Sequence, residues 1–471
     1  MIFQQEQNKW TLINKDSVLG SSFKFNEFRF YINTPDSNSG NWQLEYFYRE
    51  DLRPYEGQLA PSSQSQNIGI RNKLWTNKKN RLNWFVFYRD LHVSDTTLEN
   101  QNEDKSLNAR LEYYLHFLRG ALNGSVFYEI GKGMEQKKEY SYVEVPIGEG
   151  IYTWIDDGDD IQELDEFEIA AFQDQANFIK IFSVTNEYQN TYNMSFNESL
   201  FLNLKKLWYK KKGVLKLFSR FSDQFITQID RKLLEGNSIN YFNPYLETND
   251  LVELVSLNSM LRNVLYFNRS HSVLGLEWHH IYKANRIFLI NGFEERGLIE
   301  DMIKLRLNWN RNWQSRLQFL KGEKTNASDW MSIKNYQIDK LELQKSLQWI
   351  SGRKSRLSLK YRFANKRNIL NASNEKAIFN DIKIVWQYNL INKSALSSTL
   401  SYVNINYGGS SNSSLNYVML EALQTGRNMV WQITWNKNIE KNIQMKLSYD
   451  GRWAEDSKTI HIGRLQVRYL F

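Results

Sequence analysis

An all-β fold, an antiparallel up-and-down transmembrane β-barrel of roughly 16–20 strands, is predicted by three observations on this 471-residue chain. Apolar and polar residues alternate with period two over many segments of about ten residues, the length of a tilted membrane strand. The apolar rows are bounded by Trp and Tyr, and 14% of the chain is aromatic. The chain contains only 5 prolines, and they lie outside the rows. A continuous sheet excludes proline because it removes a ladder hydrogen bond.

The amino half contains several of these alternating rows. Trp42, Leu44, Tyr46 and Tyr48 share one face of a predicted strand, and a second row runs from Leu107 to Phe117. At Phe25 and Phe28 the phase of the apolar row shifts by one residue, which predicts a β-bulge.

The carboxyl half repeats the pattern with little interruption. Its rows run over Ile303–Trp309, Leu357–Phe363, Ile382–Tyr388, Met429–Trp435 and Ile443–Trp453. A soluble β-sandwich or β-solenoid also alternates, but globular strands average about five or six residues. Charged residues of both signs on the polar face fit a hydrated lumen better than a dry core.

The chain ends in an aromatic strand. Leu465, Val467, Tyr469 and Phe471 occupy one face, and basic or polar residues occupy the other. This pattern resembles the terminal strand of bacterial outer-membrane barrels, and the resemblance implies that Phe471 is recognised by the barrel-assembly machinery. An ordinary edge strand that happens to end the chain is the alternative.

The formal charge of +8 hides an acidic segment. Eight acidic residues and no basic residue lie between Asp156 and Glu168, within an insertion that we place at residues 139–189 of a single barrel domain, 1–471. The remainder is correspondingly basic. The first residues lack the basic start and apolar stretch of a signal peptide. If the chain is exported, we therefore expect a missing upstream region before Met1.

The segment from Tyr152 to Ala176 carries a family resemblance. A tryptophan is followed by a calcium-loop-like acidic stretch and then by Glu166-Phe167-Glu168. This resembles a module of large, poorly characterised outer-membrane proteins of Bacteroidota. The resemblance implies that family and an outer-membrane location, without an activity.

Calcium is a candidate ligand of the acidic segment. A calcium loop needs oxygen ligands at positions one, three and five, a turn at six and a bidentate carboxylate at twelve. With Glu166 at twelve, Asp157, Asp159 and Glu163 fall at three, five and nine. Ile155 then occupies position one, and Asp160 replaces the turn glycine, although Asp156 can substitute through a shifted backbone. This degenerate match predicts weak binding at most, and a solvated acidic loop explains the same residues.

The sequence favours neither catalysis nor nucleic-acid binding. The chain has no cysteine and 6 histidines, none of them within a metalloprotease motif. His279 and His280 are adjacent in a predicted strand and therefore face opposite sides, so they cannot readily share a metal. The basic and aromatic run Lys205–Lys212 is suited to anionic lipid headgroups or lipopolysaccharide phosphates at a strand end.

We therefore expect a bacterial outer-membrane β-barrel that acts as a non-enzymatic conduit or scaffold in transport, secretion or surface assembly. The expected partners are outer-membrane lipid, lipopolysaccharide, the barrel-assembly machinery and a plug or cargo protein, but no nucleic acid. We expect no cofactor apart from the calcium candidate. Two alternatives remain. An outer-membrane hydrolase would place a Ser or Asp beside a histidine at the barrel rim. A secreted, soluble glycan-binding β-protein would bury its Trp rows between sheets.

Overall fold

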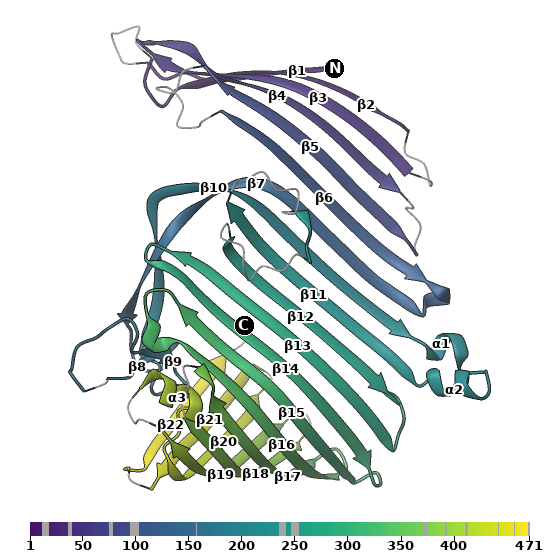
Figure 1. Cartoon of the computed structure of the whole chain (residues 1–471), viewed down its shortest axis with the longest axis vertical. Coiled ribbons are helices and arrows are strands. Elements are labelled where there is room, and N and C mark those ends of the chain that lie inside the picture. The colour runs from purple at the N-terminus through teal and green to yellow at the C-terminus, as the bar shows by residue number, and fades with distance from the viewer. Residues whose placement is uncertain are drawn as a thin grey trace. The chain divides into compact units, whose positions relative to one another are not determined.

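The computed structural model describes residues 1–11, 18–35, 40–74, 79–94, 103–156, 158–234, 242–245, 254–370, 375–390, 393–409, 413–440, 442–455 and 457–469. These residues form an all-β, essentially antiparallel arrangement, as predicted, but with 22 strands rather than the expected 16–20 (Figure 1). Two of the strands, β8 and β9, are only three residues long. No helix within the described ranges is both long and apolar enough to span a membrane.

The chain divides into two compact units. Unit 1 comprises Met1–Glu135, Tyr188–Leu202 and Phe225–Ser259, and unit 2 comprises Gln136–Glu187, Asn203–Gln224 and Met260–Phe471. Four strands contribute residues to both units. These are β7 (Leu122–Glu144), β10 (Phe178–Asn203), β11 (Phe221–Leu234) and β12 (Leu254–Phe267).

Unit 1 is an antiparallel meander in which each strand pairs with the next along the chain. Its strands before β7 are β1 (Ile2–Asn8), β2 (Phe23–Asn33), β3 (Gly40–Tyr55), β4 (Gln58–Leu74), β5 (Arg81–Val93) and β6 (Asp104–Phe117). The one-turn helix η1 (Leu118–Gly120) connects β6 to β7.

Unit 2 contains a longer meander with the same nearest-neighbour pairing. Its strands are β13 (Leu274–Leu289), β14 (Gly292–Asn308), β15 (Trp313–Ser328), β16 (Tyr336–Ser351), β17 (Ser355–Asn368), β18 (Lys376–Leu390), β19 (Ser394–Gly408), β20 (Gly426–Glu440), β21 (Ile443–Ala454) and β22 (Ile460–Tyr469). Its helices are α1 (Lys205–Trp208), α2 (Val214–Phe218), α3 (Ser414–Leu420) and the short η3 (Ser332–Lys334).

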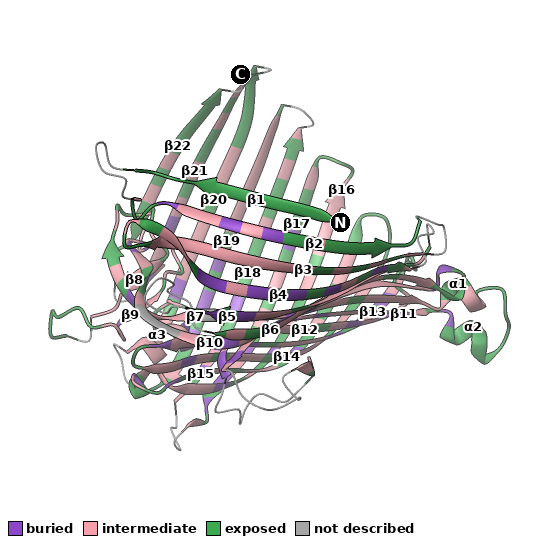
Figure 2. Ribbon diagram, turned by 90° about the horizontal axis from the view of Figure 1, so that it is seen from above, coloured by how far each residue is buried: buried purple, intermediate pink, exposed green. Residues whose placement is uncertain are grey.

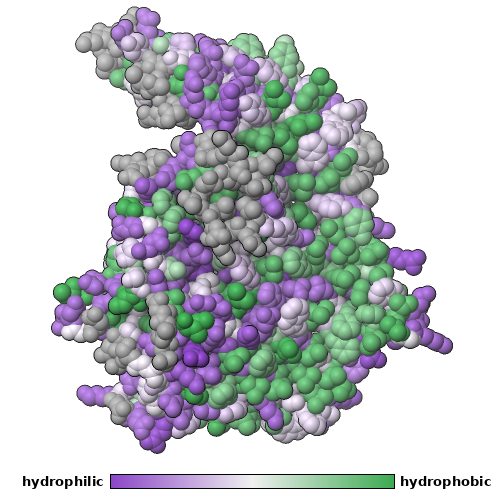
Figure 3. All heavy atoms as spheres, in the orientation of Figure 1, coloured by the Kyte–Doolittle hydropathy of each residue, from purple (hydrophilic) through white to green (hydrophobic). Residues whose placement is uncertain are grey.

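The alternation predicted from sequence separates two faces of the unit 2 meander. Leu359, Ile384 and Leu400 pair across three strands and are all at least 40% exposed. Along β18, for example, more exposed and less exposed residues alternate (Figure 2). Apolar side chains gather over β13–β16 in Figure 3. The opposite face carries charged residues, such as Arg362 and Asp381, which also pair across strands.

Two expectations about strand regularity were wrong. The predicted bulge near Phe25 and Phe28 does not exist, because β2 pairs with β3 in continuous register. Phe25 instead lies on the polar face, where the guanidinium of Arg49 stacks 4.0 Å from its ring centroid, so the aromatic residue belongs to neither an apolar row nor a bulge.

Pro54 and Pro61 were expected between strands but lie inside β3 and β4. Both prolines are close to the connection between these strands, and Pro61 pairs with Leu52 directly at a register shift. A bulge tolerates proline because the ladder is already interrupted there.

Unit 2 has both short and longer connections between its strands. Residues 309–312 and 352–354 make short connections at one end, where Tyr469 pairs with Ile443 at the end of β22. At the other end, residues 290–291 make a short connection, residues 329–335 make a longer one, and the connection between β19 and β20 contains α3. An apolar core of the unit lies at this second end, where Met419 and Leu420 of α3 pack on Phe379 and Ile405.

Candidate functional site

The acidic segment forms a small hairpin in unit 2. Of the predicted insertion, residues 139–144 belong to β7 and residues 178–189 belong to β10, because the strand alternation continues into both. The remaining connection contains β8 (Tyr152–Trp154) and β9 (Phe167–Ile169), which pair antiparallel. Phe178 at the start of β10 pairs with Tyr152 of β8, so the hairpin is joined to the first residue of the strand that follows it in the chain.

Three carboxylates converge at the tip of this hairpin. Oxygen atoms of Asp156, Asp159 and Glu166 lie within 4.8 Å of one another. Among the predicted calcium ligands, the structure therefore brings Asp159 and Glu166 together. Asp157 lies outside the described residues. Asp156 joins the group, as a shifted backbone allows.

The local backbone explains this arrangement. Asp156 Oδ1 accepts hydrogen bonds from the amides of Gly158 and Asp160, at 3.0 and 3.2 Å. Asp160 adopts a left-handed conformation with φ of 59°, so it makes the turn that a glycine makes in a regular calcium loop. The chain therefore folds back on itself within a few residues and brings Asp156 towards Asp159.

Glu166 is the buried member of the group, only 7% exposed. Its Oε2 accepts hydrogen bonds from Trp154 Nε1 at 2.6 Å and from the amide of Glu163 at 3.2 Å. Glu163 thus contacts the group through its backbone amide. Calcium takes six to eight oxygen ligands. Three carboxylates fit a weakly held cation completed by water and do not supply a full loop.

Basic and hydroxyl side chains of unit 2 hold the hairpin. Lys334 Nζ donates a 2.7 Å hydrogen bond to the carbonyl of Phe167 and lies 3.3 Å from a Glu168 carboxylate oxygen. Arg452 pairs with Asp174 at 2.7 Å. The hairpin is therefore fastened to the polar face of the meander by charge pairs, a contact that the sequence analysis did not predict.

Helix α3 contacts the same hairpin. Ser414 Oγ donates to the carbonyl of Asp165 at 2.7 Å. The hydroxyl of Tyr417 accepts from the amide of Ala171 and lies 3.3 Å from the carbonyl of Ile169. Burial raises the pKa of the Tyr417 hydroxyl above its ordinary value.

An ion network lies under the end of α3. Arg362 makes two hydrogen bonds to Glu421, at 3.0 and 3.1 Å, and Lys366 Nζ lies 3.0 Å from Glu421 Oε1. Burial of Glu421 opposes its ionisation, but the charge of Lys366 and the hydrogen bonds from Arg362 outweigh it and lower the pKa to about 2. Glu342 and Asp381 also lie within 4 Å of the Arg362 guanidinium.

His279 and His280 pair with carboxylates, the first within its own strand and the second across neighbouring strands. His279 contacts Glu277, whereas His280 contacts Asp301 at 2.9 Å, which agrees with the prediction that the two rings face opposite sides. Asp301 also accepts from Trp278 Nε1. Within the described residues, no histidine hydrogen-bonds a serine hydroxyl.

Comparisons with known proteins give only distant similarity. No protein-family model matches the chain. No curated protein sequence matches it either.

Among solved structures, the siderophore receptor PirA of Pseudomonas aeruginosa is 7% identical with a TM-score of 0.41, covering 100% of this chain and 72% of that chain. The FrpB iron transporter of Neisseria meningitidis is 9% identical with a TM-score of 0.40, covering 99% and 76%. A loop-deletion variant of the outer-membrane protein OmpT of Vibrio cholerae is 9% identical with a TM-score of 0.31, covering 95% and 97%.

Proposed function

We propose that this chain is a bacterial outer-membrane β-barrel, a non-enzymatic conduit or scaffold for polar cargo in transport, secretion or surface assembly. The observation that carries this proposal is the continuous exposed apolar face of unit 2. Its rows are aligned strand by strand, and a polar, charged face lies behind them. A lipid-facing wall around a hydrated lumen has this pattern.

The exposed tryptophans count against the soluble glycan-binding alternative. That alternative requires the Trp rows to be buried between sheets. Trp278 and Trp386 are instead 41% and 40% exposed and lie in the same rows as Ile303 and Leu357. Soluble monomers rarely expose apolar patches of more than a few hundred Å². Lipid would cover this face.

The histidine pairs give little support to the hydrolase alternative. His280 and Asp301 form a carboxylate–histidine pair, but they lie on the face that carries Trp278. Trp278 shares the carboxylate of Asp301, which is typical of an interfacial aromatic residue that satisfies its indole N–H. A non-enzymatic role therefore remains the proposal.

The acidic hairpin fits the role of an internal plug or cargo platform. Lys334 and Arg452 attach it to the polar face. Its resemblance to the Bacteroidota module supports an origin in that phylum. The contact of the barrel-assembly machinery with Phe471 remains a prediction, since that residue lies outside the described part of the chain.

A basic hairpin, residues 204–220, supports the proposal that anionic lipids are partners of this chain. It contains α1 and α2, and Val214, Leu217 and Phe218 are each at least 47% exposed. Six lysines accompany them, Lys205, Lys206, Lys210, Lys211, Lys212 and Lys216, and no acid does. Exposed apolar and cationic side chains together suit an anionic membrane surface.

Fractionation with a heat-modifiability gel tests the proposal. The full chain should remain with the outer membrane, require detergent for extraction, and migrate differently before and after boiling. A chain that stays in the soluble fraction without detergent and shows no mobility shift would overturn the barrel. Solute-selective swelling of liposomes containing the folded chain then separates a conduit from a closed scaffold.

A further inference from the structure

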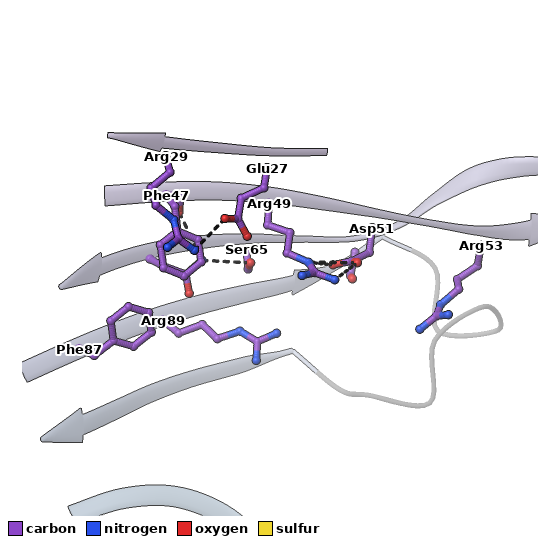
Figure 4. A pocket seen from close by; sticks show the side chains of 11 residues that line it. Glu27, Arg29, Phe47, Arg49, Asp51, Arg53, Ser65, Phe87 and Arg89 are labelled. Atoms are coloured by element: carbon purple, nitrogen blue, oxygen red, sulfur yellow. Dashed lines mark hydrogen bonds and ion pairs between the residues drawn. The ribbon is translucent and has the colours of Figure 1, made fainter. Parts of the chain in front are cut away.

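A hollow of about 440 Å³ lies on the polar face of β2–β5 in unit 1 (Figure 4). It exists because β4 carries the small residues Ser63 and Ser65 on this face, between larger residues of β3 and β5. Gly69 stands further along the same face of β4. A Cβ on Gly69 would lie 3.0 Å from the Phe87 ring and 2.8 Å from Glu45. Glycine is therefore required for the close approach of these side chains. The volume is within the range of small-molecule sites, about 300–1,000 Å³.

Strand register brings arginines to the hollow from three strands. Arg29, Phe47, Asn67 and Arg89 pair successively across β2, β3, β4 and β5, so an arginine stands at each end of one row. In total the lining contains four arginines and two acids: Arg29, Arg49, Arg53, Arg89, Glu27 and Asp51. Figure 4 shows Arg49, Arg53 and Arg89 extending from their strands on the same side.

The two acids neutralise only part of this charge. Glu27 pairs with Arg29 at 2.8 Å. Asp51 makes a two-pronged pair with Arg49, at 2.8 to 3.2 Å. Within the described residues, the guanidinium of Arg89 makes no ion pair. The lining therefore keeps a positive excess, and a guanidinium binds carboxylate or phosphate through two parallel hydrogen bonds.

The remainder of the lining supplies neutral contacts. Ser65 Oγ accepts from Asn67 Nδ2 at 3.1 Å, so its hydroxyl hydrogen remains for a ligand acceptor. The rings of Phe47 and Phe87 stack with centroids 5.6 Å apart beside the arginines. The hollow thus offers a cationic edge, a hydroxyl donor and an apolar wall.

We propose that this arginine hollow binds a small organic anion, a phosphate or carboxylate carried on an apolar or ring-shaped body. Arg89 holds the anionic group, and Phe47 and Phe87 contact the body of the ligand. The inference deepens the proposed function by naming the class of polar cargo. The identification of the bound anion as cargo rests on that function. The hollow itself lies within unit 1 and needs no contribution from the acidic hairpin.

Calorimetry on the full chain folded in detergent tests the proposal, with phenyl phosphate as the probe. Benzoate tests the carboxylate source and benzyl alcohol is the neutral analogue. We expect saturable binding of phenyl phosphate, benzoate or both, and none of benzyl alcohol. Arg89→Gln should weaken binding at least about fivefold, since the variant loses a charge-assisted hydrogen bond to the anion that water and salt screen only in part. Arg89→Lys should lie between the two.

Arg71→Gln is the matched control. Arg71 stands on the same face of β4, outside the hollow, and its nearest acid, Glu45, is 3.8 Å away. Substitution of Arg71 should change the affinity for the anion less than about twofold, because water and salt screen a charge that stands outside the hollow. Equal weakening by Arg71→Gln and Arg89→Gln, or absence of binding by both anions, would overturn the inference. A retained mobility shift on boiling without anion binding overturns only the hollow. Anion binding without that shift overturns only the barrel.

Discussion

Arg362 on β17 and Glu421, the residue that follows α3, form a bidentate ion pair across 59 positions of the chain. Glu421 adopts a left-handed backbone conformation, with φ of 57°, which a non-glycine residue holds only at a cost. The pair offsets that cost and directs α3 towards the strand ends. The acidic hairpin, which α3 contacts through Ser414 and Tyr417, thereby gains its support from β17.

Glu421→Gln should destabilise the folded chain at pH 6 by about 1–2 kcal/mol, because a charge-assisted pair is lost while part of the side chain remains in water. The effect should depend on pH. The pKa of Glu421 is lowered to about 2 from 4.5, so its stabilisation is complete above pH 4.5 and is lost as the pH falls towards 2. The urea midpoints of the native chain and of Glu421→Gln should therefore differ clearly at pH 6 and lie closer together at pH 3.

Glu455→Gln is the control for that experiment. Glu455 pairs with Arg427 at the surface, where such pairs contribute little. A difference between the native chain and Glu421→Gln that stays constant from pH 6 to pH 3 would contradict the assignment.

Calcium should bind the acidic hairpin weakly. We expect added calcium to raise the thermal midpoint of the full chain, with half-saturation in the range of about 10⁻⁴–10⁻³ M, because the ligand set is incomplete. Asp159→Asn should abolish the shift, whereas Glu149→Gln, an exposed acid of the same connection, should retain it. Identical midpoints with calcium and with a chelator would leave the carboxylates as a solvated loop.

The strand pattern could be predicted from sequence because alternation is local to each strand. Cross-strand register is not local, and this is why the row from Arg29 to Arg89 escaped prediction although each arginine stands in a visible polar row. Asp156 was similarly assigned a lesser role by the spacing of a regular calcium loop. The left-handed turn at Asp160 repositions it, and a non-glycine left-handed residue has no reliable sequence signal.

The basic hairpin should select anionic lipid. Replacing Lys210, Lys211 and Lys212 by Gln should reduce retention of phosphatidylglycerol by the purified chain at least about tenfold, since each lysine near an anionic surface contributes about 1 kcal/mol. The amount of lipid that co-purifies from mixed phosphatidylglycerol and phosphatidylethanolamine micelles measures this. Arg353→Gln with Lys354→Gln, in a connection at the same end of unit 2, provides the control. Equal losses in both variants would indicate a general charge effect.

Substitutions on neighbouring residues of β18 should separate the two faces of the wall. Ile384 lies on the exposed apolar face, with Leu359 and Leu400 beside it. Val385 lies on the polar face, paired with Ser358 and Thr399. Ile384→Arg should cost about 2–4 kcal/mol in lipid, the penalty for a cation near the bilayer midplane, and Val385→Arg should cost much less.

Unfolding in urea after reconstitution into phospholipid vesicles measures both variants in the environment that matters. The midpoint of Ile384→Arg should fall well below that of Val385→Arg, because only the first arginine must leave water. The same ranking should shrink in detergent micelles, which let a long side chain reach the surface more easily. If Val385→Arg is instead the more damaging substitution in vesicles, the apolar face does not meet lipid and the barrel wall is oriented the other way.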